Sequence, residues 1–219
     1  MQKILFFLFL LINNSIWAQT DFPVKEWNAK DTKNPFVFYI SGDGGLNSFS
    51  TSLCESISSK GYRLTALNAK SYFWNKQTPE RVAADINSFI SAKRLKADDK
   101  IIFVGYSFGA DVLPFIVNRL PEVLKKKIRS VILLSPSPTT DFEIHWSDML
   151  GGNKKRSMDV ADEINKLSVT KTTTIFGSDE KDFSPGKISL KSFTNKTLAG
   201  GHHFEGNTEE VAKMIISCF

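Results

Sequence analysis

The chain has 219 residues, of which 42% are hydrophobic and 23% charged, an ordinary globular composition that predicts one domain with a sizeable core. Its net charge of +5 is attributed to a lysine-rich surface, because the short basic runs at residues 125–127 and 154–156 contain no interleaved aromatic residues. We therefore expect no nucleic-acid partner, and no segment beyond the N-terminus is long and apolar enough to be a predicted membrane span.

The first 18 residues are typical of a secretory signal peptide. Lys3 precedes an apolar stretch, residues 4–12, which is too short to cross a bilayer, and a small residue, Ala18, provides the expected cleavage site. No cysteine lies at that site, so we expect no lipoprotein anchor. The processed chain is predicted to reach the periplasm or the exterior, where conditions are oxidising.

After a polar lead-in over residues 19–34, apolar runs alternate with helical patterns. Strands are predicted at residues 35–40, 62–68, 101–104, 128–134, 172–176 and within 188–197, and helices at 46–60, from 79 onward, after 107 and at 207–219. This alternation predicts a mostly parallel sheet of about six strands with helices on both faces, in one domain over residues 35–219. The long irregular stretch at residues 135–156 is predicted to be a lid-like or binding insertion.

The strand at 101–104 runs directly into Gly-Tyr-Ser-Phe-Gly, residues 105–109, and then into a helix. In this context Gly-x-Ser-x-Gly predicts a nucleophile elbow, a strained turn that exposes the hydroxyl of Ser107 above the sheet. A side chain at Gly105 or Gly109 would collide with the neighbouring strand and helix. The expected fold class is therefore an α/β-hydrolase, with Ser107 as the nucleophile.

A serine nucleophile needs a histidine base, and the chain contains three histidines. His145 precedes every plausible acid, whereas the order in this fold is serine, acid, histidine, so we interpret it as a lid or surface residue. His202 and His203 follow the last predicted strand, where the base belongs. Adjacent residues in an extended chain point in opposite directions, so only one should face Ser107. We expect His203, directly before Phe204, with His202 as the reserve.

The acid that orients the base is expected in the loop at residues 177–182. Glu180, three residues after the glycine, is the first candidate, and Asp182 is the second. Asp179 is interpreted as support for the turn. The choice between Glu180 and Asp182 stays open at this point.

An oxyanion hole requires backbone N–H donors beside the nucleophile. One is expected from Phe108, and the second from Asp43 or Gly44 in the glycine loop, residues 41–45. This loop lacks the Lys-Ser/Thr ending of a P-loop and the spacing of a dinucleotide fingerprint, so nucleotide binding is rejected. We expect neither a cofactor nor a metal.

Four motifs together resemble the bacterial virulence proteins of the VirJ and AcvB type over nearly the whole processed chain. They lie at residues 41–45, at 71–74 with 78–80, at 105–115 and at 200–204. The resemblance implies an exported α/β-hydrolase, associated in some members with type IV secretion, that hydrolyses an aminoacyl ester of phosphatidylglycerol. It also implies contact with a membrane surface and with secretion-system proteins. The chain departs from the pattern at Leu46, where a tryptophan is usual, and near the fifth strand, where Thr174 and residues 183–184 replace expected cysteines.

Two further groups of residues bear on the substrate. Tyr72, Phe73 and Trp74 follow the second predicted strand and either form a wall of the cleft or pack in the core. The insertion combines acidic and apolar side chains that would suit a cationic aminoacyl head group: Asp141, Glu143 and Asp148 with Phe142, Ile144 and Trp146.

Other interpretations remain open. The protein would act on a soluble substrate if it were a generic secreted esterase, thioesterase or peptidase, and it would be inactive if it were an adaptor on a hydrolase scaffold. The two cysteines, Cys54 and Cys218, lie on the first and last predicted helices, which should pack on one sheet face. They form either a disulfide or two buried thiols.

Overall fold

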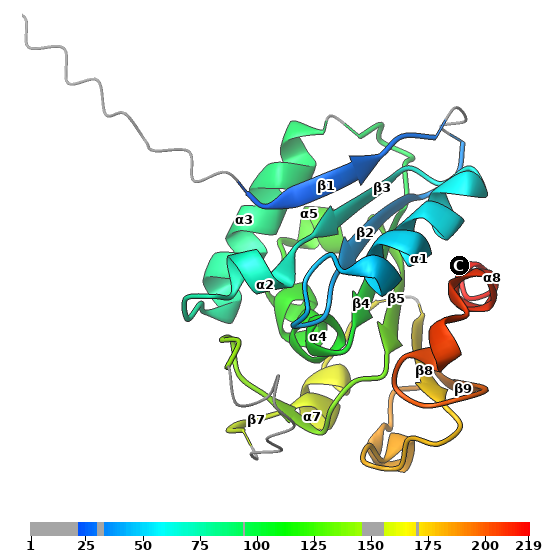
Figure 1. Ribbon diagram of the computed structural model, residues 1–219. Coiled ribbons are helices and arrows are strands. Elements are labelled where there is room, and N and C mark those ends of the chain that lie inside the picture. The colour runs from blue at the N-terminus through cyan, green and yellow to red at the C-terminus, as the bar shows by residue number, and fades with distance from the viewer. Residues whose placement is uncertain (1–21, 30–32, 94, 146–155, 170) are drawn as a thin grey trace, which may run out of the picture.

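The structure is a computed structural model that describes residues 22–29, 33–93, 95–145, 156–169 and 171–219. The predicted signal peptide lies outside these ranges. Seven strands in the described ranges form one sheet, in the order β1-β3-β2-β4-β5-β8-β9 (Figure 1). The strands are β1 Val24–Trp27, β2 Phe36–Ile40, β3 Leu64–Leu67, β4 Ile101–Tyr106, β5 Ile128–Leu134, β8 Thr172–Gly177 and β9 Phe193–Leu198. Neighbouring strands are parallel except β1, which is antiparallel to β3.

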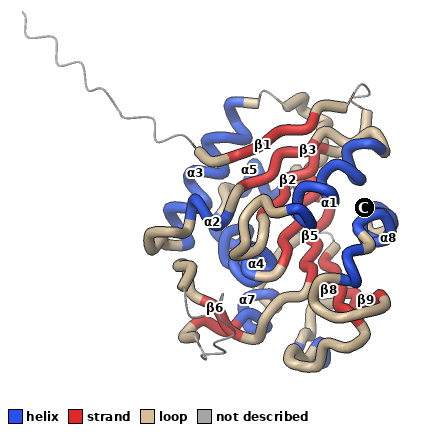
Figure 2. The backbone as a smooth tube through the Cα atoms, viewed as in Figure 1, coloured by secondary structure: helices blue, strands red, loops and turns tan. Residues whose placement is uncertain are grey.

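Helices cover both faces of the sheet, so the central strands are buried on both sides (Figure 2). In β2, Phe36, Phe38 and Ile40 belong to one hydrophobic cluster, whereas Val37 and Tyr39 belong to the other. Helices α3 (Pro79–Ala92), α4 (Phe108–Arg119), α5 (Glu122–Lys125) and α7 (Val160–Ile164) contribute to the first cluster, and α1 (Ser48–Ser59) and α8 (Thr208–Ile216) contribute to the second. None of the helices in the described ranges has the length and apolarity that crossing a bilayer requires.

Several helix ends have the signals that the sequence predicts. Thr78 caps α3, accepting a hydrogen bond from the Arg81 N–H at 3.2 Å, and Pro79 is the first helical residue. Gly61 follows the end of α1 with a φ of 90°, a conformation that favours glycine.

The predicted pairing of the first and last helices is also found, since α1 packs against α8. Cys54 and Cys218 are both buried and free. The structure therefore has the alternative of two buried thiols and no disulfide between them.

Several short elements were not predicted, and β1 and α2 (Ala69–Tyr72) are two of them. Strand β1 lies within the expected polar lead-in, where Lys25 and Glu26 are exposed because this strand is at the edge of the sheet. Helix α2 lies in an expected loop and is capped by Asn68, whose side chain accepts from the Ser71 N–H. Smaller elements in the described ranges are β6 Thr139–Thr140, β7 Met158–Asp159, η1 Pro185–Lys187 and η2 Phe204–Gly206.

Candidate active site

Ser107 lies in the turn between β4 and α4, at the carboxyl edge of the sheet. Its φ of 52° and ψ of −122° are strained for a residue with a side chain, as expected of a nucleophile elbow. A Cβ on Gly105 would lie 2.4 Å from the Gly109 carbonyl oxygen, and one on Gly109 would lie 2.2 Å from the Ile40 carbonyl oxygen. The predicted elbow geometry and its need for both glycines are confirmed.

A histidine from the other end of the chain meets this serine. The Nε2 atom of His202 lies 2.8 Å from the Ser107 Oγ, and its Nδ1 atom lies 2.9 Å from the Glu180 Oε2. Ser107 follows β4, Glu180 follows β8 and His202 follows β9, so the three side chains converge at one edge of the parallel sheet. This is the geometry that allows an imidazole to accept a serine proton while a carboxylate orients the ring.

Glu180 is held by three hydrogen-bond donors. Besides His202, the Ser135 hydroxyl donates to its Oε1 at 2.6 Å, and the Gly177 N–H donates to the same atom at 2.7 Å. Burial raises the pKa of Glu180, but these three hydrogen bonds favour the charged form and hold its pKa below the ordinary value. The hydrogen bond to Glu180 in turn raises the pKa of His202, against the effect of burial.

The prediction that His203 faces Ser107 is wrong. Its Nδ1 atom instead hydrogen-bonds the Tyr106 hydroxyl, and its side chain is exposed. The two histidines do point in different directions, but the conformation of the histidine loop, residues 200–204, decides which one reaches the serine. Positive φ angles of 93° at Gly200 and 50° at Phe204 make this loop far from extended.

Of the two candidate acids, Glu180 is the one whose carboxylate contacts the His202 ring. Asp182 is exposed to solvent, two residues further along the loop. Asp179 accepts a hydrogen bond from the Ser178 hydroxyl at 3.0 Å, and its N–H donates to the Gly200 carbonyl, which fits the predicted role in supporting the turn.

The two segments expected to supply the oxyanion donors lie next to the serine. Phe108 is the first residue of α4, so its N–H has no acceptor within the helix. The glycine loop packs against the nucleophile, since a Cβ on Gly42 would lie 3.3 Å from the Ser107 Cβ. The Gly44 N–H already donates to the Asp43 carboxylate at 2.8 Å, which leaves the Asp43 N–H as the better second candidate.

The aromatic residues after β3 divide between core and surface. Phe73 is fully buried, with its ring centroid 5.1 Å from that of Phe108. It therefore packs against the elbow inside the core and does not line a cleft. Tyr72 is partly buried and donates its hydroxyl proton to Asp85 at 2.6 Å, whereas Trp74 is 45% exposed. The core alternative is therefore correct for Phe73.

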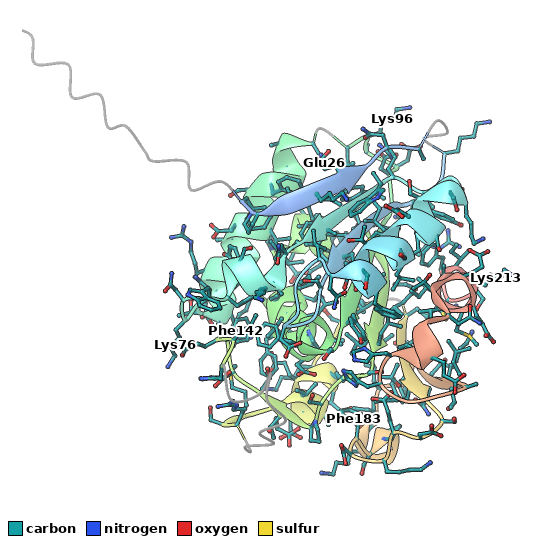
Figure 3. The ribbon with its side chains drawn as sticks, in the orientation of Figure 1. Glu26, Lys76, Lys96, Phe142, Phe183 and Lys213 are labelled. Atoms are coloured by element: carbon teal, nitrogen blue, oxygen red, sulfur yellow. The ribbon has the colours of Figure 1, made fainter. Side chains whose placement is uncertain are left out.

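The described part of the insertion is attached to this aromatic segment. The Phe142 carbonyl accepts from the Gln77 N–H at 2.8 Å, and the Ile144 N–H donates to the Phe73 carbonyl at 3.0 Å. Phe142 therefore lies beside the loop that contains Lys76 (Figure 3). His145 contacts Asp141 at 2.8 Å and makes no hydrogen bond to the serine. Trp146 and Asp148, which we assigned to the same lid, lie outside the described residues.

Sequence reasoning missed three residues around the site: Ser135, Tyr106 and Asp111. Ser135 directly follows β5, the strand between β4 and β8. A polar residue at the carboxyl end of this strand could have indicated a place in the site. Asp111 lies one turn after Ser107 on α4, is 5% exposed, and accepts a hydrogen bond from the Ser137 N–H at 2.5 Å. Burial raises the pKa of Asp111 to about 7. An acidic residue inside an apolar helix pattern was its only sign in the sequence.

Within the described ranges, no group of three or more histidine, cysteine, aspartate or glutamate side chains is placed to hold a metal ion.

A family model described as "Bacterial virulence protein (VirJ)" matches residues 34–219. The chain belongs to the VirJ family. The resemblance seen in the sequence motifs is thereby confirmed, and the match of this VirJ-family chain extends over all the elements that form the site. A search of curated protein sequences finds no match.

Solved structures share the fold of this VirJ-family chain at low sequence identity. MenH from S. aureus is 13% identical, with a TM-score of 0.66 and coverage of 89% of this chain and 97% of that one. A thioesterase domain from the curacin biosynthetic pathway is 16% identical, with a TM-score of 0.62 and coverage of 88% and 94%. Est1E from Butyrivibrio proteoclasticus, bound to ferulic acid, is 15% identical, with a TM-score of 0.61 and coverage of 89% and 92%. The fold is that of the α/β-hydrolases, as predicted.

Proposed function

We propose that this VirJ-family protein is an exported serine hydrolase that cleaves an ester bond through an acyl-enzyme. The observation that carries the proposal is the unbroken series of hydrogen bonds Ser107–His202–Glu180 at a strained elbow. Such a series makes a serine hydroxyl nucleophilic at neutral pH, which an isolated hydroxyl is not.

The reaction follows from the positions of these atoms. The Ser107 Oγ bonds to the ester carbonyl carbon while the His202 Nε2 accepts the hydroxyl proton, and the carbonyl oxygen takes the displaced electron pair. The N–H groups of Phe108 and Asp43 stabilise this oxyanion. The carbon–alkoxy bond then breaks, and the leaving alcohol takes the proton from His202. Water, deprotonated by His202, hydrolyses the acyl-enzyme and restores Ser107.

For the substrate we propose an aminoacyl ester of phosphatidylglycerol. Family membership supports it, and so does the charge of the site, because the Asp43 and Asp111 carboxylates lie close enough to His202 to raise its pKa together with Glu180. Negative charge around the serine favours a substrate with an ammonium group beside the scissile carbonyl and disfavours an anionic acyl group. A lipid substrate also implies reversible contact with a membrane surface on the periplasmic side, and secretion-system proteins are proposed partners.

The serine mechanism is tested by labelling the full chain, purified after export, with a fluorophosphonate probe. We expect labelling of the native protein, none of Ser107→Ala, and a loss of at least about 10³-fold in labelling rate for His202→Gln. His203→Gln should lose much less, because its ring does not contact Ser107. A folded native protein that neither labels nor turns over any ester would contradict the proposal and favour the adaptor role.

The substrate is tested with vesicles of lysyl-phosphatidylglycerol, with Ser107→Ala as the control. Release of lysine supports the aminoacyl ester, whereas release of fatty acid from the same vesicles would identify a lipase. Hydrolysis of a soluble lysine alkyl ester or thioester without any release from vesicles would identify a generic secreted esterase or thioesterase.

A further inference from the structure

The residue before the nucleophile, Tyr106, is joined to the loop that carries the base. Its hydroxyl lies 3.3 Å from the His202 carbonyl oxygen and 2.5 Å from the His203 Nδ1. Tyr106 is the last residue of β4 and is 2% exposed. One buried hydroxyl therefore contacts both histidines, across 96 residues of sequence.

The tyrosine ring is fixed by its neighbours, so the direction of the hydroxyl is fixed as well. Its centroid lies 4.9 Å from that of Phe49 on α1, which in turn lies 6.2 Å from the His203 ring and 6.4 Å from the Phe204 ring. Burial raises the pKa of Tyr106 above its ordinary value, so the hydroxyl keeps its proton and can form hydrogen bonds.

The conformation of the histidine loop is itself unfavourable, so contacts with the rest of the protein must hold it in place. Phe204 and Glu205 have positive φ angles of 50° and 52°, which cost free energy in residues with side chains. Gly200, at the start of the loop, is joined to the loop after β8, since its carbonyl accepts from the Asp179 N–H at 3.1 Å and its N–H donates to the Ser178 hydroxyl at 3.2 Å. Tyr106 joins a different part of the histidine loop, at His202 and His203, to the strand that leads into the nucleophile.

We infer that Tyr106 is a positioning residue that holds the histidine loop so that the His202 Nε2 stays in line with the Ser107 Oγ. Tyr106 and Ser107 are adjacent in the chain, so the nucleophile and the attachment of its base lie on one rigid backbone segment. The inference rests on the proposed serine mechanism.

The test is Tyr106→Phe, which removes the hydroxyl and keeps the ring in its packing. We expect kcat for lysyl ester hydrolysis to fall by about 10- to 100-fold with KM changed less than about 2-fold, because misplacing a base affects the chemical step. Tyr39→Phe is the matched control. It removes another buried tyrosine hydroxyl, bonded at 3.1 Å to Ser50 and to neither histidine, and should keep the native kcat.

A second measurement does not depend on turnover. Proton NMR of the imidazole N–H between His202 and Glu180 should show a low-field resonance in the native protein and in Tyr39→Phe, and a broadened or shifted one in Tyr106→Phe. If the native protein proves inactive, the proposed function fails while this resonance still tests the positioning role. An unchanged resonance in Tyr106→Phe overturns the inference, and so does a kcat equal to that of Tyr39→Phe.

A double-mutant cycle locates the interaction. If the hydroxyl acts partly through the His203 ring, Tyr106→Phe and His203→Phe should be non-additive in kcat, the pair losing clearly less than the product of the two single losses. Full additivity would show that the His203 contact has no part in positioning, and the inference would be overturned for that contact.

Discussion

Two buried donors, the Ser135 hydroxyl and the Gly177 N–H, favour the charged form of Glu180. Ser135 donates to it from a backbone conformation with a φ of 48°, an unfavourable angle that the surrounding structure must impose. The Asp111 carboxylate accepts from the Ser137 N–H two residues later and so fixes the turn in which Ser135 lies. The orientation of His202 therefore depends on a second layer of hydrogen bonds around the acid.

The proposed reaction should depend on pH through His202. His202 must be neutral to accept the serine proton, and Glu180 raises its pKa above the ordinary 6.5, so activity should fall as the pH drops through that raised value. Glu180→Gln should move this acid limb to lower pH and reduce the rate of Ser107 labelling by about 10²- to 10⁴-fold, because the ring loses its orienting carboxylate.

The measurement is the rate of fluorophosphonate labelling from pH 5 to 9. Asp182→Asn is the comparison variant, since Asp182 is the exposed acid of the same loop and should leave the profile unchanged. A shift of the acid limb by Asp182→Asn, and not by Glu180→Gln, would show that the orienting acid is misassigned.

At the scale of elements, the contact between α4 and β2 controls the elbow. A Cβ on Gly109 would lie 2.2 Å from the Ile40 carbonyl oxygen and 2.6 Å from that of Ser41. Both obstacles are backbone atoms, so they cannot move without displacing β2 from its place between β3 and β4.

Gly109→Ala is therefore expected to destabilise the protein by about 1–3 kcal/mol or more and to slow labelling of Ser107. Gly186→Ala is the matched control, because a Cβ there meets no atom within 4 Å and its φ is not in the left-handed region. It should be neutral or stabilise by up to about 1 kcal/mol. Urea denaturation of the two variants gives the comparison, and equal stabilities would contradict this account of the elbow.

The sequence predicts the elements of this fold unevenly. The buried strands β2, β4, β5 and β8 were predictable because continuous apolar runs are required where both faces of a sheet are covered. The edge strand β1 was not, because its exposed Lys25 and Glu26 give no such pattern. Likewise the loops bearing Ser107, Glu180 and His202 were predictable. The choice of His202 over His203 was not, because it also depends on positive φ angles at Phe204 and Glu205, residue types that rarely adopt them.

At the scale of the whole molecule, the site depends on the complete fold. Its residues follow β2, β4, β5, β8 and β9, and they meet only when these strands are assembled in order. Assembly also buries the Asp111 carboxylate in α4, beside His202 and Asp43. Folding is thus linked to a proton on Asp111, and this linkage is measurable.

Asp111 has a pKa of about 7 in the folded protein, mainly because of burial, against an ordinary value of 3.8. Between these two values the folded state binds a proton that the unfolded chain does not, so this residue makes stability fall as the pH rises from about 4 to about 7. Asp111→Asn cannot titrate, and its side-chain oxygen can still accept from Ser137. From pH 5 to pH 8 the stability of Asp111→Asn relative to the native protein should therefore rise by about 2–3 kcal/mol.

Urea denaturation at several pH values measures this difference. Glu180 has the opposite linkage, since its lowered pKa gives stability that is present above its unfolded value and lost as the pH falls through the folded one. Glu180 is unchanged in both proteins, so its own contribution cancels in the difference. What remains belongs to Asp111, together with the effect of its charge on the pKa of His202. A difference that stays constant from pH 5 to pH 8 would mean that Asp111 keeps its charge throughout. In that case Asp111 would stay negatively charged beside Ser107 throughout this pH range. The proposed preference for a cationic substrate would then be the same below neutral pH as above it.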